Sequence, residues 1–548
     1  MATHLSSLDV LVVDCQATAP SPTNGHLLEV GWGSVRTDRD EVAVESRLVT
    51  PPEGTTLPKQ VRRVTGISDE ELAAGSSAES VWAELVAAAD RIAGVGGSEK
   101  CPTIIHFSRF EEPYLRFLGG GANESFPLEI VCTHEIARRL LPRLPRRGLR
   151  ALAGFFGHAV PDGRRAAHHV EATAAVWRRI VGQLEHDVGV RTLEDLDAWL
   201  STSTPPRAPT APRHEYPMPA KRRRALPDRP GVYRMLRASG DILYIGKATS
   251  LRQRVATYFQ KSTKHADHIL EMLTQAHDVE TFVTGSALEA ALEETDQIKR
   301  HVPAYNKALR PEGRRLVFAT KDFTQLSETA DGAHRLGPLP DSDALAAASR
   351  LARASTDDVS ASETVAVPDA YAPTEDTLFR GLAIYRAAGG SRSVLVYGAA
   401  LWRERQRLVD AQPEPELRLK VEYDEGVERW TPESVAARLG ELAARASHLV
   451  RRAHWLSILS ESSLEWDRGV IGFRGGVIRS RSDRVISRPR NAPFEERRKR
   501  FDLAAYDRMT VLLKELRRLA AGERPLRLHT ADGASLSGPR LREVLRWI

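Results

Sequence analysis

The sequence predicts an α/β multidomain protein in which two α/β domains precede an α+β region. Apolar strand-like runs alternate with segments of helical periodicity over the first 185 residues, a pattern typical of an α/β domain with a mixed sheet. Residues 201–219 are proline-rich, and residues 354–377 are acidic, small and proline-containing, as linkers are. A chain of 548 residues is also too long for one hydrophobic core.

The first domain is expected to contain buried strands at 8–14, 27–35 and 102–107. The segments ESVWAELVAAADRIA and EATAAVWRRIVGQL place apolar residues at helical spacing. Asp14 ends the first strand and Gln16 follows two positions later, so both side chains point to one face of the strand.

The second domain begins with PGVYRMLRASGDILYIGKATSLRQRVATYF (230–259). Two β runs flank the turn signal RASGD, which predicts a hairpin that brings Tyr233 and Tyr244 onto adjacent strands. Gly246 and Lys247 are expected to open the helix that follows.

Two helices follow this hairpin. Arg254 and Tyr258 are four residues apart in the first, so they share a helical face. Residues 284–306 begin the second helix, with Glu289 in its first turns. Beyond the acidic linker, strands are expected at 469–481 and a helix with a basic face at 500–521. We identify no chemistry in that final region.

Charge and composition limit the possible partners and the compartment. The formal net charge of +6 suits a polyanionic partner, although the basic clusters at 221–224 and 495–500 also fit solvated surfaces. Three scattered cysteines indicate neither a disulfide framework nor a zinc site. Because the sequence has no long apolar run and no signal-peptide pattern, we expect a cytoplasmic protein that does not bind membranes.

The motifs of the second domain resemble those of the GIY-YIG nucleases, in the branch of the bacterial excinuclease UvrC and its relative Cho. PGVY, LYIGKA, LRQRV with YF, EA and IKRHVPAYN occur in the order and spacing of that family. Residues 316–326 and 334–352 also look like the segment that follows the domain in UvrC-like proteins.

This resemblance implies a phosphodiester hydrolase with a defined set of roles. Glu289 would hold one Mg²⁺ or Mn²⁺ ion, and Arg254 would grip the scissile phosphate. One of the tyrosines Tyr233 and Tyr244, aided by Lys247, would orient or deprotonate the attacking water; which tyrosine acts as base is left open. The resemblance implies supporting positions at Gly246, Tyr258 and Asn306.

Each of these residues also has a structural explanation. Ser286 and Glu289 fit an S-x-x-E capping box, the two tyrosines fit half-buried strand positions, and Arg254 fits an exposed helix charge. A nucleotide-binding P-loop is excluded because Asp241 and Ala248 stand where that motif requires Gly and Ser or Thr.

Residues 8–185 resemble the DEDDh exonuclease domain of the epsilon subunit of DNA polymerase III, which implies an RNase H-like mixed-sheet fold. The matching segments are LVVDCQATAP, residues 57–75, IIHFSRFEEPYL, residues 133–157 and EATAAVW. That family uses four acids, two metal ions and a histidine. Here Asp14 fills the first position, and four others depart from the pattern: Gln16 for Glu, Glu111 for Asp, His169 for Asp and Arg164 for the histidine.

With two carboxylates left, the charge of two Mg²⁺ ions is poorly offset, so we expect a degenerate exonuclease site. We interpret the chain as a metal-dependent DNA endonuclease making single-strand incisions in DNA (nucleotide excision) repair, with damage-recognition proteins as possible partners and the exonuclease-like module binding DNA. The alternatives are a 3′–5′ exonuclease acting through the first domain and a non-catalytic nucleic-acid-binding scaffold. The expected organisation is 1–188 exonuclease-like, 189–224 helical tail and basic linker, 225–310 GIY-YIG, 311–353 UvrC-like extension, 354–377 linker and 378–548 α+β region.

Overall fold

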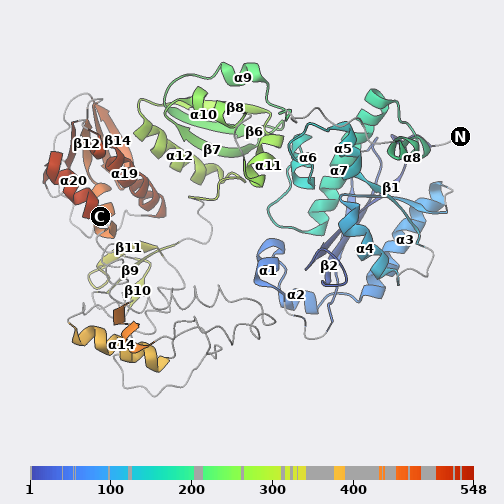
Figure 1. Cartoon of the computed structure of the whole chain (residues 1–548), viewed down its shortest axis with the longest axis horizontal. Coiled ribbons are helices and arrows are strands. Elements are labelled where there is room, and N and C mark those ends of the chain that lie inside the picture. The colour runs from blue at the N-terminus through green and yellow to red at the C-terminus, as the bar shows by residue number, and fades with distance from the viewer. Residues whose placement is uncertain are drawn as a thin grey trace. The chain divides into compact units, whose positions relative to one another are not determined.

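The structure, a computed structural model, describes residues 3–202, 214–340, 375–388, 431–437, 452–482 and 502–547, apart from short gaps inside these ranges (Figure 1). It divides into two compact units, Met1–Ala290 with Pro303–Lys307 and Ala291–Val302 with Ala308–Ile548. The predicted basic cluster at 495–500 and residues 354–374 of the predicted acidic linker lie outside the described residues.

The N-terminal sheet has the strand order β3-β2-β1-β4-β5. β1, β2 and β3 are antiparallel, whereas β4 runs parallel to both β1 and β5, so the predicted mixed sheet is confirmed. The strands and helices of this part are β1 (Val10–Ala17), β2 (Leu27–Val35), β3 (Ala43–Leu48), α1 (Lys59–Thr65), α2 (Asp69–Ala73), α3 (Ala78–Gly96), β4 (Cys101–Ile105), α4 (Ser108–Leu118), β5 (Leu128–Cys132), α5 (Thr133–Leu140), α6 (Leu149–Phe155), α7 (Ala166–Gln183), the π-helix η1 (Leu184–Val188) and α8 (Leu193–Ser201).

Both faces of this sheet are covered, which explains why β1 is a nearly continuous apolar run. Val10 and Val12 belong to the hydrophobic cluster that includes α7, and Leu11 and Val13 to the cluster that includes α3. Asp14 lies in β1 at 4% exposure, so it is a carboxylate placed within a core strand.

A smaller antiparallel sheet has the order β7-β6-β8. The predicted hairpin is confirmed, with Tyr233 in β6 and Tyr244 in β7. Gly246 and Lys247 do not open a helix: they lie inside β7, because its pairing with β6 continues to Ala248. This part comprises α9 (Ala220–Arg224), β6 (Gly231–Leu236), β7 (Ile242–Ala248), α10 (Leu251–Thr257), α11 (Asp267–Gln275), β8 (Asp278–Val283) and α12 (Ala287–His301).

The second unit contains two further sheets, with orders β10-β9-β11 and β14-β13-β12-β15-β16. The antiparallel second sheet, together with α19 and α20, confirms the predicted α+β character of the C-terminal region. Lys299 of α12 pairs with Asp507 of α19 at 2.6 Å. The elements are β9 (Leu316–Ala319), β10 (Leu326–Ser327), β11 (Leu336–Pro340), α14 (Glu375–Ala387), β12 (Ser463–Trp466), β13 (Gly469–Arg474), β14 (Val477–Ser482), α19 (Leu503–Ala521), β15 (Leu526–His529), β16 (Ser535–Ser537) and α20 (Gly538–Trp547).

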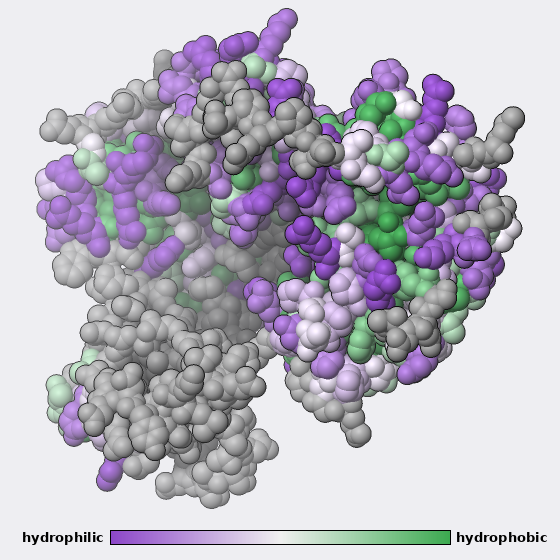
Figure 2. Space-filling model, turned by 45° about the vertical axis from the view of Figure 1, so that its right-hand side comes forward, coloured by the Kyte–Doolittle hydropathy of each residue, from purple (hydrophilic) through white to green (hydrophobic). Residues whose placement is uncertain are grey.

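Hydrophilic side chains cover most of the described surface on the face drawn in Figure 2, with smaller apolar areas between them. Among the helices that the structure describes, none combines the length and the apolar character needed to cross a membrane.

Candidate nuclease site

The small sheet brings two tyrosines together over a glycine. Tyr233 pairs with Gly246 across β6 and β7, and Tyr244 lies two residues before Gly246, so the three share one face of the sheet. The ring centroids of Tyr233 and Tyr244 are 6.1 Å apart. A Cβ at position 246 would lie 2.4 Å from the Tyr233 hydroxyl, so only glycine leaves room for that ring.

Helix α10 adds Arg254 and Tyr258 to the tyrosine pair. The hydroxyl groups of Tyr258 and Tyr233 form a hydrogen bond of 2.9 Å. The Arg254 guanidinium carbon lies 5.3 Å from the centre of the Tyr258 ring, within cation–π range. The shared face predicted for Arg254 and Tyr258 is therefore seen, and it directs the arginine toward the tyrosines.

Glu289 stands in the first turn of α12. Ser286 holds it twice: the Ser286 hydroxyl accepts from the Glu289 backbone N–H at 3.1 Å and donates to Glu289 Oε1 at 3.2 Å. Gly231, the first residue of β6, pairs with Ala248 at the end of β7 and with Val283 at the end of β8, so both strands finish at the same end of the sheet. Since α10 follows β7 and α12 follows β8, the first turns of both helices lie at that end.

Asn306, which lies 61 residues after Ile245 of β7 in the sequence, binds the backbone of that strand. Its side-chain amide accepts from the Ile245 N–H and donates to the Ile245 carbonyl, each at 2.9 Å. Ile245 sits between Tyr244 and Gly246, so this bracket fixes the strand that carries the YIG residues. Lys247 follows Gly246 in β7, and strand alternation directs its side chain to the opposite face from the tyrosines.

Burial sets the protonation of this cluster. Tyr233 is fully buried, and its burial, together with Tyr258 and Tyr244, raises the pKa of its phenol well above the usual range. The phenol is therefore protonated at neutral pH. Partial burial opposes the charge of Arg254, but Tyr233 and Tyr258 outweigh it and raise the pKa of the guanidinium.

The donor set at Glu289 fits one hard divalent cation. Among the described residues, no group of three or more His, Cys, Asp or Glu side chains could hold a metal ion. Mg²⁺ does not need such a cage, because it commonly binds one or two carboxylates and keeps several water ligands. Glu289, oriented by the Ser286 hydroxyl, is a carboxylate of that kind.

The exonuclease-like region presents a closed polar cluster instead. Asp14 Oδ2 accepts from Gln16 Nε2 at 2.6 Å, and Asp14 Oδ1 lies 3.1 Å from His169 Nδ1. Gln16 Nε2 is also 3.1 Å from His169 Nδ1. A ring nitrogen carries either a proton or a lone pair, so His169 either donates to Asp14 or accepts from Gln16. The aspartate is occupied at one oxygen by an amide and approached at the other by an imidazole.

Glu111 is buried beside this cluster. Its burial, and the negative charge of Asp14, raise the pKa of Glu111 well above its usual range. Burial also raises the pKa of Asp14, although His169 opposes the change. Two Mg²⁺ ions do not fit this set, because Asp14 and Glu111 offset their charge poorly, and a neutral amide and an imidazole stand where the family has two further acids.

The structure places Arg164 on the surface, where its N–H donates to the Val64 carbonyl at 2.9 Å. Sequence reasoning missed Glu29, which faces Gln16 across β1 and β2 and is bound by Arg165 at 3.0 Å. An acid within the run LLEVGWGSV was the available signal.

The sequence of this part of the chain matches a known family. Residues 229–307 match the family model for the UvrC-like GIY-YIG domain. They form a UvrC-like GIY-YIG domain. All predicted residues of its site, from Tyr233 to Asn306, fall inside the matched range.

Two curated relatives match different lengths of chain. The UvrABC system protein C of Psychrobacter sp. is 47% identical over 98 residues, which are 18% of this chain and 16% of that protein. A putative bifunctional exonuclease/endonuclease protein of Mycobacterium tuberculosis is 28% identical over 256 residues, 46% of this chain and 36% of that protein. The chain therefore spans well under half the length of these relatives.

Solved structures resemble two separate parts of the chain. The magnesium-bound GIY-YIG N-terminal endonuclease domain of UvrC from Thermotoga maritima is 32% identical and covers 16% of this chain and 92% of its own, with a TM-score of 0.14. The nuclease domain of 3′hExo, a DEDDh family member bound to rAMP, is 15% identical and covers 32% of this chain and 92% of its own, with a TM-score of 0.27.

Proposed function

We propose that this protein is a divalent-metal-dependent DNA endonuclease of the UvrC/Cho type that makes single-strand incisions in DNA repair. One observation carries the proposal: Tyr233 and Tyr244 lie against Gly246, Tyr258 bonds to Tyr233 and carries Arg254 over its ring, and Glu289 is held in the first turn of α12. The names of the UvrABC relatives support the assignment to repair.

In this proposal Arg254 binds the phosphate. Its planar guanidinium can make two parallel hydrogen bonds to phosphate oxygens, and the tyrosines behind it fix its position. The protonated Tyr233 orients the attacking water through its hydroxyl, and the hydrogen bond with Tyr258 holds that hydroxyl in position.

Glu289 would hold the Mg²⁺ or Mn²⁺ ion, which supplies charge neutralisation at the phosphate and the leaving oxygen. Ser286 sets the direction of the carboxylate through its hydrogen bond to Oε1. Lys247 serves as a cation near the DNA backbone rather than as part of the tyrosine cluster, since it leaves β7 on the other face.

The exonuclease-like region binds DNA without cutting it in this proposal. Its closed cluster of Asp14, Gln16 and His169 argues against two-metal hydrolysis. Damage-recognition proteins of excision repair are the proposed partners, and the cytoplasm is the proposed compartment.

The test is nicking of supercoiled plasmid, undamaged and ultraviolet-irradiated, with Mg²⁺ or Mn²⁺. Wild type should nick in a metal-dependent manner, and Glu289→Gln should abolish nicking because it removes the metal-binding charge. The matched control is Glu293→Gln, one turn further along α12. The Glu293 carboxylate accepts a hydrogen bond from the Gln297 side chain at 2.8 Å. It should nick like wild type.

End-labelled linear DNA separates the alternatives. Internal cuts that require Glu289 support the endonuclease, whereas a ladder of single-nucleotide steps surviving in Glu289→Gln would favour the 3′–5′ exonuclease. Metal-independent binding with no cleavage of either substrate would instead favour the non-catalytic scaffold.

A further inference from the structure

The exonuclease-like region and the GIY-YIG domain, which belong to one compact unit, meet along helices α6 and α11 (Figure 1). The closest approach is at Gly154 of α6, where a Cβ would lie 1.9 Å from Gln275 Oε1. Gln275 is fully buried and hydrogen-bonded on both sides of its amide, so it cannot swing away to admit a larger residue. The helices therefore require glycine at position 154.

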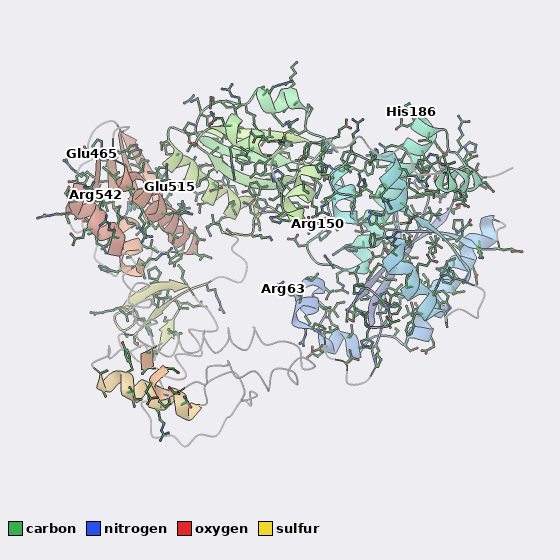
Figure 3. The ribbon with its side chains drawn as sticks, in the orientation of Figure 1. Arg63, Arg150, His186, Glu465, Glu515 and Arg542 are labelled. Atoms are coloured by element: carbon green, nitrogen blue, oxygen red, sulfur yellow. The ribbon has the colours of Figure 1, made fainter. Side chains whose placement is uncertain are left out.

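Polar contacts cross this interface at several points. The Arg146 N–H donates to the Thr274 hydroxyl at 3.2 Å. His277 Nε2 donates to the Phe155 carbonyl at 2.8 Å. Figure 3 labels Arg150, which approaches Glu271 at 3.7 Å. Specific bonds of this kind fix the relative position of two surfaces more narrowly than apolar packing alone, because each has a preferred distance and angle.

The contacts continue inward to Tyr305. The Arg150 guanidinium carbon lies 5.5 Å from the centre of the Tyr305 ring. The Tyr305 hydroxyl donates to Glu271 Oε1 at 2.6 Å and accepts from Gln275 Nε2 at 2.5 Å. Arg237 donates to the same Gln275 at 3.1 Å. The Tyr305 hydroxyl is thus held by two side chains of α11, while its ring also packs in the core of the GIY-YIG domain.

Tyr305 is followed by Asn306, the residue that brackets β7. The Tyr305 N–H donates to the Leu243 carbonyl at 3.0 Å, and Asn306 binds both backbone groups of Ile245. A displacement of Tyr305 would therefore move the bracket on the strand that carries Tyr244 and Gly246. This is a continuous chain of contacts from α6 to the nuclease strand.

We propose that Arg150, in the exonuclease-like region, is a positioning residue for the endonuclease site and acts through Glu271, Tyr305 and Asn306. The α6 surface is then a permanent docking face for the GIY-YIG domain of the same chain. The exonuclease-like region contributes to incision by holding β7 in place, which needs no chemistry at Asp14. This inference rests on the proposed endonuclease function.

The experiment measures plasmid nicking by the full chain as separate kcat and KM values for wild type, Arg150→Ala and Arg150→Lys. Arg150→Ala should lower kcat about 10-fold, since small misplacement of reacting groups is costly, and should leave KM for DNA within about twofold. Arg150→Lys keeps the positive charge beside Tyr305 and Glu271 and should recover most of the loss. Gly154→Ala, which pushes on Gln275, should also lower kcat.

Arg116→Ala is the matched control, because Arg116 pairs with Glu112 at 2.7 Å on the exposed surface of α4. It should nick like wild type, and thermal unfolding of all variants reports loss of fold. The inference alone is overturned by unchanged kcat in Arg150→Ala, by a loss that Arg150→Lys does not reverse, or by equal loss in Arg116→Ala. Absence of metal-dependent nicking by the wild type would overturn the proposed function and this inference with it.

Discussion

Asp14 and Glu289 are the carboxylates of two candidate nuclease sites, and they differ in their burial and in their hydrogen-bond partners. Asp14 is nearly fully buried in a core strand, with Gln16 and His169 at its two oxygens. Glu289 is half-buried at a helix start and accepts one side-chain hydrogen bond from Ser286. A carboxylate binds a hard cation only if it stays ionised and retains free lone pairs. Asp14 departs from both conditions, because burial raises its pKa and protein side chains contact both of its oxygens, whereas Glu289 lies in a partly exposed first helical turn.

Burial also has different consequences for the ionisable residues beside these two carboxylates, Tyr233 and Glu111. Tyr233 and Glu111 are both buried, and desolvation raises the pKa of each well above its usual range. A protonated phenol can still donate to and accept from a water molecule, whereas a protonated carboxyl group has lost the charge that a metal site needs. Desolvation is therefore compatible with the proposed role of the tyrosine, whereas it disfavours the charged form of Glu111.

The largest expected effect is at Arg254. Arg254→Ala should lower kcat for nicking about 100-fold, because it removes the charge that meets the phosphate in the transition state. Arg254→Lys should recover only part of this loss, since an ammonium group lacks the planar fork. Steady-state nicking of plasmid measures both. Arg252→Ala, which removes an exposed ion pair with Asp228 on the same helix, is the control and should retain activity. Full activity of Arg254→Ala would show that the GIY-YIG site, like the exonuclease-like site, does not perform the cleavage in the proposed way.

A smaller loss is expected at Gly246. A Cβ there would lie 2.4 Å from the Tyr233 hydroxyl and 2.9 Å from Tyr244 Cε1. Gly246→Ala should lower the free energy of unfolding by about 1–3 kcal/mol, as overpacking does, and lower kcat because Tyr233 must move. Gly182→Ala in α7 is the matched control, because the added Cβ would meet nothing within 4 Å outside the adjacent backbone of its own helix. Denaturant unfolding and nicking are measured together; a stable Gly246→Ala variant with full activity would contradict this account.

The free energy of unfolding is expected to depend on pH through Glu111 in the exonuclease-like region. Because the pKa of Glu111 is raised in the folded state, the folded protein keeps a proton that the unfolded chain releases above about 4.5. Its contribution to stability is thus fully present below that pH and falls as pH rises, by about 1.4 kcal/mol per unit until the folded pKa is reached. Glu111→Gln should remove this slope.

Denaturant unfolding between pH 4 and pH 8 tests the slope. The gain from Glu111→Gln should be near zero at the acid end and increase with pH. Glu112→Gln, at the half-buried neighbouring position, should leave the slope unchanged. A gain from Glu111→Gln that is the same at every pH would show that Glu111 is ionised in the folded state, as a metal-binding carboxylate would be.

The smallest effect is expected at Asp14. Asp14→Asn should leave plasmid nicking unchanged, and neither wild type nor the variant should shorten end-labelled single-stranded DNA stepwise. The reason is that both oxygens of Asp14 are already engaged within the protein. Metal-dependent stepwise shortening that disappears in Asp14→Asn would give the exonuclease-like site an active role.

Local pattern was enough to predict much of this protein. The hairpin with Tyr233 and Tyr244, the helical neighbours Arg254 and Tyr258, and the helix start at Glu289 all depend on residues within a few positions of one another, where periodicity and turn signals operate. Local pattern also misassigned one boundary: Gly246 and Lys247 remain in β7 because cross-strand pairing extends the strand beyond its apolar run.

Tertiary structure alone decided what distant residues do to each other. Asp14 is contacted by a histidine 155 positions away, and Gly154 meets Gln275 from a separate domain. Sequence lists the acids of a site but not their burial, and burial determines whether a carboxylate carries a charge or a proton. The residues that could perform nuclease chemistry were thus visible in the sequence. The burial of Asp14 and the contacts of α6 with α11 depended on the packing of segments remote in the sequence.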